Sequence, residues 1–154
     1  MTFFTDLFQN EIFVAAGMGW LVAQILKTLI FVLINKKFDP ERLVGSGGMP
    51  SSHSSTVCAL ATATCIEYGA GSFEFAIALI FAIIVMYDAR GVRRETGIQA
   101  HVINELMQAF ADMGRKDISI DKKLKEFVGH TPLQVLAGAI LGILVALSVL
   151  SLGA

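Results

Sequence analysis

The sequence predicts an all-α membrane protein: a polytopic membrane helical bundle with about four transmembrane helices plus one amphipathic helix. Three observations predict this class. Hydrophobic residues make up 55% of the 154 residues and charged residues only 16%, whereas about 25% charged residues is usual in a soluble domain. Four apolar stretches are separated by polar connections, and the basic residues concentrate in two of these connections. We treat the whole chain, 1–154, as a single integral membrane domain.

The candidate transmembrane segments are residues 14–34, 54–68, 73–87 and 132–152. The first and last contain the roughly 20 residues that a helix needs to cross a bilayer, and Pro132 suits a first helical turn. The middle two have 15 residues each, so they are either thin spans or a hairpin that does not fully cross. The short connection GAGS, 69–72, makes them antiparallel neighbours.

The distribution of charge predicts the orientation of these helices. Eleven of the 12 Lys and Arg residues fall in the first-to-second and third-to-fourth connections, and the opposite side carries Asp and Glu without Lys or Arg. The positive-inside rule then places both long connections in the cytoplasm and both termini on the other side of the cell membrane. The net charge of −1 gives no field that would attract nucleic acid, so we expect no nucleic-acid partner.

The long connection before the last span divides into two parts. Residues 98–113 place apolar side chains at helical spacing, which predicts an amphipathic helix in the interface or against the bundle. Residues 114–130, GRKDISIDKKLKEFVGH, are polar and basic. They predict a solvated cytoplasmic loop near anionic lipid head groups.

The stretch GGMPSSHSS, residues 47–55, is unusually polar for a turn between apolar segments. Pro50 fits the first position of a helix, and Ser51 or Ser52 is a candidate cap. A helix start presents backbone N–H groups and the positive end of its dipole, which suits an anion such as phosphate, and His53 adds a proton donor near neutral pH. The alternative is that the serines only cap the helix and the histidine lies among the head groups.

A second polar cluster, YDARGVRRETGIQAH, covers residues 87–101 at the end of the third apolar segment. Antiparallel packing of the middle helices would bring it beside His53. Arginine side chains bind phosphate oxygens in a bidentate manner, which makes Arg93 and Arg94 candidate phosphate ligands. A positive-inside anchor would explain the arginines alone, but not the accompanying Asp88 and Gln99.

Lys27 interrupts the first apolar segment. A lysine in an apolar helix is costly unless it reaches the interface, forms a pair or lines a polar cavity. Both the interface and the phosphate site remain open for it. No metal-ligand spacing stands out among the acidic residues and histidines, so we expect neither a metal nor another cofactor.

The two motifs, GGMPSSHSS and DARGVRRETGIQAHVIN (88–104), resemble a divergent branch of the phosphatidic acid phosphatase type 2 and vanadium haloperoxidase superfamily, labelled acid phosphatase/vanadium-dependent haloperoxidase-related. With the flanking helices, the resemblance covers most of residues 20–110. It implies a helical bundle in which a lysine and arginines hold phosphate. In the parent superfamily a Pro-Ser-Gly-His-type motif protonates the leaving group, and a Ser-Arg-x5-His-x3-Asp motif supplies the nucleophilic histidine and its orienting aspartate.

Carried onto this chain, the resemblance makes His53 the general acid, with Ser52 in place of glycine. The later motif implies His101 as nucleophile, with Glu105 four residues on where the parent has aspartate. Arg94 precedes His101 by seven positions instead of six, and the parent's first motif is missing because Leu43 follows Arg42. Taken together, the residue patterns and the resemblance give Lys27, Arg42, Ser51, Ser52, Arg93 and Arg94 as candidate phosphate ligands, supported by Asp88 and Gln99.

These observations predict an integral membrane phosphatase that acts on a lipid phosphate or diphosphate at the cytoplasmic face. Two other classes stay open: a non-catalytic binder or carrier of phosphorylated lipid, and a structural membrane subunit. The expected partners are membrane lipids and a phosphorylated lipid. A homodimer also stays open, because four short helices could need a second copy to enclose a site.

Overall fold

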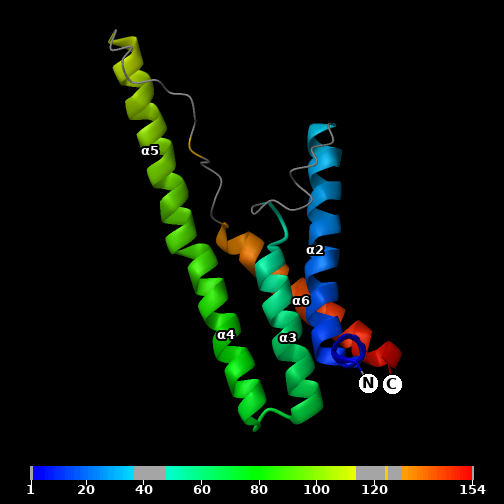
Figure 1. Cartoon of the computed structure of the whole chain (residues 1–154). Helices are drawn as coiled ribbons and strands as arrows, with labels where there is room; N and C mark the ends of the chain where they lie inside the picture. Colours follow the sequence, from blue (N-terminus) through cyan, green and yellow to red (C-terminus); the bar gives the residue numbers. More distant parts are fainter. Residues whose placement is uncertain (1, 37–47, 114–123, 125–129, 154) are drawn as a thin grey trace.

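The computed structural model describes residues 2–36, 48–113, 124 and 130–153; of these, the side chains of residues 92–94, 111 and 153 are not described. The described residues form helices and no strand, which confirms the all-α prediction (Figure 1). The helices are α1 (Phe3–Gln9), α2 (Glu11–Asn35), α3 (Ser52–Tyr68), α4 (Phe73–Arg90), α5 (Val92–Asp112) and α6 (Pro132–Gly153). The short α1 was not expected from the sequence.

The helix ends follow from capping residues in the sequence. Asn10 accepts a hydrogen bond from the Phe13 N–H at 3.0 Å at the start of α2, and Ser72 accepts one from the Phe75 N–H at 3.1 Å at the start of α4. Such side chains satisfy N–H groups that lack a partner within the helix. Gly69, with φ +85°, ends α3. The tight α3–α4 connection that results makes these helices antiparallel, as Figure 1 shows.

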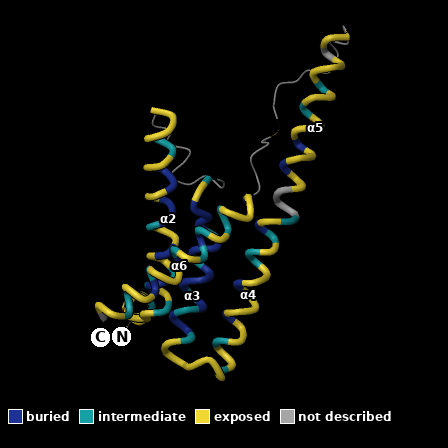
Figure 2. Tube along the Cα trace, turned by 180° about the vertical axis from the view of Figure 1, so that it is seen from behind, coloured by how far each residue is buried: buried dark blue, intermediate teal, exposed yellow. Residues whose placement is uncertain are grey.

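Helix α3 occupies the centre of the bundle and packs against α2, α4 and α6. Figure 2 shows its buried residues surrounded by the exposed outer faces of the neighbouring helices. Those outer faces carry Leu, Ile and Phe side chains, whereas the contacts around α3 use much smaller residues. This inverted arrangement is typical of helices that pack in a membrane, where the lipid is as apolar as the core.

We call the central contact the small-residue seam. Its residues recur at every fourth position on three helices. They are Ala15, Gly19 and Ala23 on α2, Ser51, Ser55, Ala59 and Ala63 at the start of and along α3, and Gly138, Gly142 and Ala146 on α6. A Cβ atom at position 138 or 142 would collide with the backbone carbonyl oxygen of Ser51 or Ser55, respectively. The glycines of α6 therefore allow direct contact between the backbones of two helices.

Within the described residues, three helical segments are long and apolar enough to cross a membrane: Glu11–Asn35, Phe73–Phe110 and Pro132–Leu152. Helix α3 has 17 residues and is enclosed by its neighbours. The four predicted crossings therefore stay a prediction. The segment Phe73–Phe110 has 38 residues and measures about 57 Å at 1.5 Å per residue, which exceeds the roughly 45 Å of a whole bilayer. Part of this rod must project beyond the membrane if it crosses.

The rod consists of α4 and α5, which follow one another at Gly91 in nearly one line (Figure 1). Helix α5 extends away from α3 and, among the described helices, packs only against α4. It covers the expected amphipathic segment but begins six residues earlier, at Val92 instead of 98. Its apolar side chains, such as Leu106, are exposed, so the structure does not place it against the bundle. Its position in the interface stays a prediction.

Candidate functional site

Buried polar residues gather where the motif GGMPSSHSS enters α3. Lys27 is only 3% exposed and His130 only 2%. We call these residues the polar cluster. Its members are Gln24, Lys27, Thr28, Ser51, Ser52, Ser54, Ser55 and His130. Ionisable groups buried inside a membrane bundle are costly, which makes this cluster the candidate functional site.

The start of α3 is built by the serines of the motif. Ser51 is the N-cap: its Oγ accepts hydrogen bonds from the Ser54 N–H at 3.3 Å and from the Ser54 hydroxyl at 3.1 Å. Ser52 and His53 are the first two residues of the helix, at the positive end of its dipole. Pro50 precedes the cap and does not occupy the expected first helical position. A residue before the N-cap keeps a non-helical backbone, and the helix begins only at Ser52.

The side chain of Lys27 lies against Gly48, the second residue of the motif. A Cβ atom added to Gly48 would lie 3.0 Å from both Cγ and Cδ of Lys27, and Gly48 has φ +89°. Only glycine combines this backbone conformation with so close an approach. Lys27 therefore does not extend to the surface, and of the two alternatives for it, its burial favours participation in the site.

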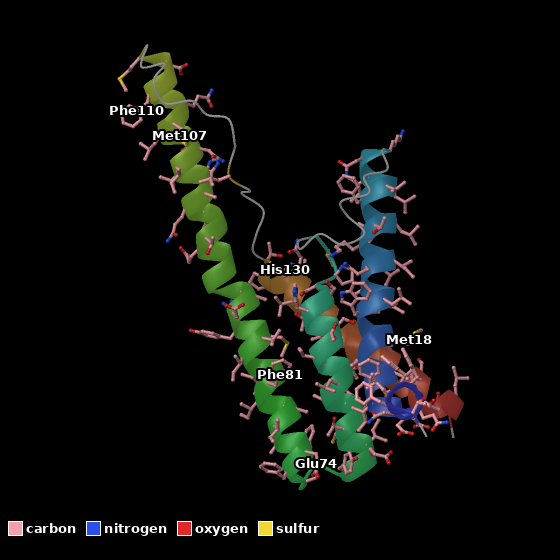
Figure 3. All side chains as sticks on the ribbon, viewed as in Figure 1. Met18, Glu74, Phe81, Met107, Phe110 and His130 are labelled. Carbon is pink, nitrogen blue, oxygen red and sulfur yellow. The ribbon has the colours of Figure 1, made fainter. Side chains whose placement is uncertain are left out.

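His130 is the residue that sequence reasoning missed. Its backbone N–H donates to the carbonyl oxygen of Ala89 at 3.2 Å, so it lies against the end of α4. Its ring stands edge-on to the ring of His53, with the centroids 6.1 Å apart and the planes at 61°. Figure 3 shows His130 at the start of α6, next to the start of α3. Three segments that are distant in sequence thus meet at one pair of histidines.

Gln134 holds the ring of His130 and also caps α6. Its Oε1 accepts from the Thr131 backbone N–H at 3.1 Å, and the Gln134 N–H donates to Thr131 Oγ1 at 3.4 Å, which is a reciprocal capping box. Because a backbone N–H can only donate, the atom facing it is the amide oxygen. The same oxygen lies 3.1 Å from His130 Nδ1, a contact that favours the neutral tautomer with its hydrogen on Nδ1.

The other predicted catalytic pair lies elsewhere. His101 Nε2 and Glu105 Oε1 are 3.3 Å apart, as the i,i+4 spacing suggests, but both side chains are more than half exposed. They lie midway along α5, which contacts α4 and not α3. The structure thus forms the predicted pair without bringing it to His53, and their catalytic roles stay predictions.

The remaining predicted residues divide between the site and positions outside it. Asp88 is half-buried and adjoins Ala89, the residue that accepts from His130. Gln99 is exposed on α5. Arg42 lies outside the described residues, and so do the side chains of Arg93 and Arg94 at the start of α5. Their roles as phosphate ligands stay predictions.

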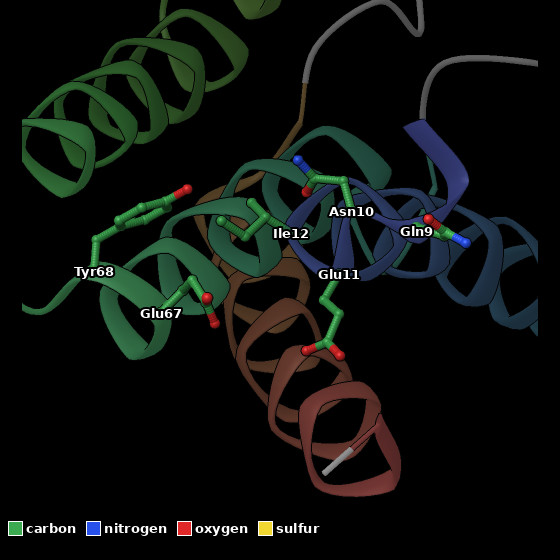
Figure 4. Close-up of a pocket in the computed structure, with 6 residues that line it drawn as sticks. All are labelled: Gln9, Asn10, Glu11, Ile12, Glu67 and Tyr68. Carbon is green, nitrogen blue, oxygen red and sulfur yellow. The ribbon is translucent and has the colours of Figure 1, made fainter. Parts of the chain in front are cut away.

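A polar pocket lies at the opposite end of α3 and does not belong to this site. It has a volume of about 350 Å³ and is lined by Glu11, Glu67 and Tyr68, among others (Figure 4). Its two carboxylates make it unsuited to an anion. Within the described part of the chain, no group of three His, Cys, Asp or Glu residues is arranged to hold a metal ion.

Comparison with protein families identifies the family to which the chain belongs. A model described as the divergent PAP2 family matches residues 8–145, a range that includes both His53 and His130. The chain belongs to the divergent PAP2 family. This confirms the resemblance drawn from the two motifs. The chain is also 42% identical over 135 residues to the uncharacterized membrane protein YuiD of Bacillus subtilis (strain 168), covering 81% of this chain and 84% of YuiD.

No solved structure matches the chain. The YuiD relative and the apolar helices together identify a membrane protein. No motif in the sequence marks His130. Gln134, four residues later, stands where the parent superfamily's last motif has aspartate. Position 124, six residues before His130, is leucine where that motif has arginine.

Proposed function

We propose that this divergent PAP2 protein is an integral membrane phosphatase that removes a phosphoryl group from a lipid phosphate or diphosphate at the cytoplasmic face. One observation carries the proposal: the ring centroids of His53 and His130 lie 6.1 Å apart, edge to face, at the start of α3, where the polar cluster gathers. Two imidazoles at this separation can both reach a single phosphoryl group. The concentration of Lys and Arg in the two long connections of the sequence supports the cytoplasmic assignment.

In the proposed reaction, the Nε2 lone pair of His130 attacks phosphorus and the bond from phosphorus to the lipid oxygen breaks. His53 gives its proton to that oxygen as it leaves. Water then attacks the phosphohistidine, His53 takes a proton from that water, and inorganic phosphate departs. The start of α3 and the Lys27 ammonium would stabilise the phosphoryl oxygens, because both bring positive charge to the site.

His130 and Gln134 thus take the roles that the sequence resemblance gave to His101 and Glu105. The geometry favours this assignment of roles because the Gln134 contact favours the His130 tautomer whose Nε2 can act as nucleophile. His101 has its own carboxylate partner, but on a helix that does not contact α3.

The test is phosphate release by the detergent-purified protein from a panel of long-chain lipid phosphates and diphosphates. We expect His53→Ala and His130→Ala each to lose about 10²–10⁴-fold in rate, and His101→Ala, the matched control, to stay close to wild type. Brief reaction with a labelled substrate should trap an acid-labile phosphoenzyme in wild type but not in His130→Ala. Full activity in His130→Ala together with loss of activity in His101→Ala would mean that His101 of α5, and not His130, is the nucleophile.

A non-catalytic binder or carrier of phosphorylated lipid is the second candidate, and Gln134 is the observation that favours it. A neutral amide stabilises the imidazolium and the phosphohistidine less than the aspartate of the parent motif would. This candidate predicts saturable binding of phosphorylated lipid that is lost in Lys27→Met, with no phosphate released from any substrate. A structural subunit would instead show changes in stability alone in these variants.

A further inference from the structure

We infer that an apolar groove between α2 and α6 holds the hydrocarbon chain of the phosphorylated lipid whose head group reaches His53 and His130; this inference rests on the proposed function. The groove has a volume of about 390 Å³. Its walls include Leu26 and Ile30 of α2, Met49 and Pro50 of the motif, and residues from Ala137 to Leu144 of α6.

The motif itself separates the polar cluster from this groove. Gly48 packs on the buried side chain of Lys27, Met49 and Pro50 line the groove, and Ser51 caps α3. Polar and apolar surfaces therefore meet within four consecutive residues. A molecule with a phosphate at one end and a hydrocarbon chain attached to it matches this succession of surfaces.

Helix α6 has the same transition along its first turns. Gln134 faces His130, and Ala137, one turn later, lines the groove. The groove follows α6 over the eight residues from Ala137 to Leu144, whose ends are about 10 Å apart along the helix axis at 1.5 Å per residue. This is roughly a third of the hydrocarbon thickness of a bilayer. The groove therefore contacts only the part of the chain next to the head group, and the remainder extends among the membrane lipids.

A second groove on α4 provides an internal comparison. It also has a volume of about 390 Å³ and is lined by apolar residues such as Ala76, Ile77 and Ile80. Membrane lipids would fill either groove by apolar contact alone. Only the groove between α2 and α6 includes residues of the motif, so only that groove should affect how a phosphorylated lipid is used.

The kinetic test compares Ala137→Trp with Ala76→Trp, which fill the two grooves with the same side chain. For Ala137→Trp we expect KM for a long-chain lipid phosphate to rise about tenfold or more, as loss of a few buried methylene contacts would produce. Its kcat/KM for a water-soluble phosphate monoester without a chain should not change, which also shows that the variant is folded. Ala76→Trp should match wild type with both substrates. An equal effect of the two variants, or an equal loss on both substrates in Ala137→Trp, would overturn the inference.

A crosslinking test separates this inference from the proposed function. The probe is a lipid phosphate with a photoreactive diazirine on the chain near its head group, compared with the same lipid lacking the phosphate. We expect the phosphate to enrich crosslinks on the α2 and α6 walls over those on α4. Enrichment without phosphate release would contradict the phosphatase and leave the groove in place. Phosphate release with crosslinks spread equally over both grooves would contradict the groove alone.

Discussion

The backbone N–H of Ser51 donates to the backbone carbonyl oxygen of Gln134 at 3.0 Å, and so joins the segment that carries His53 to the segment that carries His130. A second backbone hydrogen bond, from His130 to Ala89, adds the end of α4. The relative position of the two histidines thus depends on main-chain contacts, which side-chain substitutions nearby leave in place. This makes single substitutions at the site informative about chemistry.

Gln134 should control the chemistry of His130. Gln134→Leu removes the acceptor for both His130 Nδ1 and the Thr131 N–H. We expect phosphate release to fall by at least about 10²-fold, because the group that selects the tautomer of a catalytic histidine is lost, and the helix cap to weaken by about 1 kcal/mol. Steady-state rates and thermal unfolding in detergent measure the two effects separately.

Gln134→Glu is the matched variant for the same position. It keeps both acceptor contacts and adds a negative charge beside His130, which favours the protonated ring and raises the pKa of His130. Because the nucleophile must be deprotonated, the acidic limb of the pH–rate profile should move to higher pH. An unchanged profile in Gln134→Glu, with full activity in Gln134→Leu, would remove Gln134 from the mechanism.

The small-residue seam should tolerate no added methyl group on α6. Gly142→Ala places a Cβ against the carbonyl oxygen of Ser55, and we expect the free energy of unfolding to fall by about 1–3 kcal/mol from overpacking. The control is Gly17→Ala, since a Cβ there meets nothing within 4 Å and Ala gains about 0.5–1 kcal/mol over Gly inside a helix. Unfolding in denaturant should therefore move the two variants in opposite directions. Equal stability of both would contradict the close approach of α3 and α6.

Ser55 should contribute to the contact between α3 and α2 through its hydroxyl. Its Oγ donates to the Gly19 carbonyl oxygen at 2.8 Å in a fully buried position. Ser55→Ala should lower the free energy of unfolding by about 0.5–1.5 kcal/mol. Ser148→Ala serves as reference, because Ser148 is exposed and donates within its own helix, to Leu144 at 2.9 Å. A loss of the same size in both variants would mean that the interhelical bond contributes nothing.

Membrane topology can be tested by labelling single cysteines after Cys58 and Cys65 are replaced by alanine. Lys123→Cys in the basic loop should react with a membrane-impermeant maleimide from the cytoplasmic side only, because the loop is positively charged. Glu67→Cys, near the turn between α3 and α4, should react only from the opposite side. Labelling of both from the same side would mean that α3 and α4 form a hairpin that does not cross.

The helices could be predicted to within about three residues at the ends of the four apolar segments. The reason is local: Ser72 caps α4, Gly69 ends α3 and Pro132 opens α6, and each acts on its own turn. The predicted start of the amphipathic helix was less accurate, because α5 follows directly on α4 at Gly91 without the polar break that the sequence suggested.

The candidate site was only half predictable. His53 stood out because its motif is continuous in sequence, whereas His130 reaches it only after the chain returns from α5 to α6. The spacing of apolar residues within each helix does not predict that the start of α6 will meet the start of α3. The burial of Lys27 was equally hidden, since it involves the close approach of Gly48, 21 residues further along the chain.

The small-residue seam around α3 also restricts rearrangement of the protein interior. Alanine and glycine have no rotamers and serine has few, so folding freezes almost no side-chain entropy there, and no change of rotamer opens an alternative packing. The rotamer-rich Leu, Ile, Phe and Met side chains are on the outside instead. Adjustment to bilayers of different composition is therefore confined to the periphery, while the helix start that presents His53 keeps a single geometry.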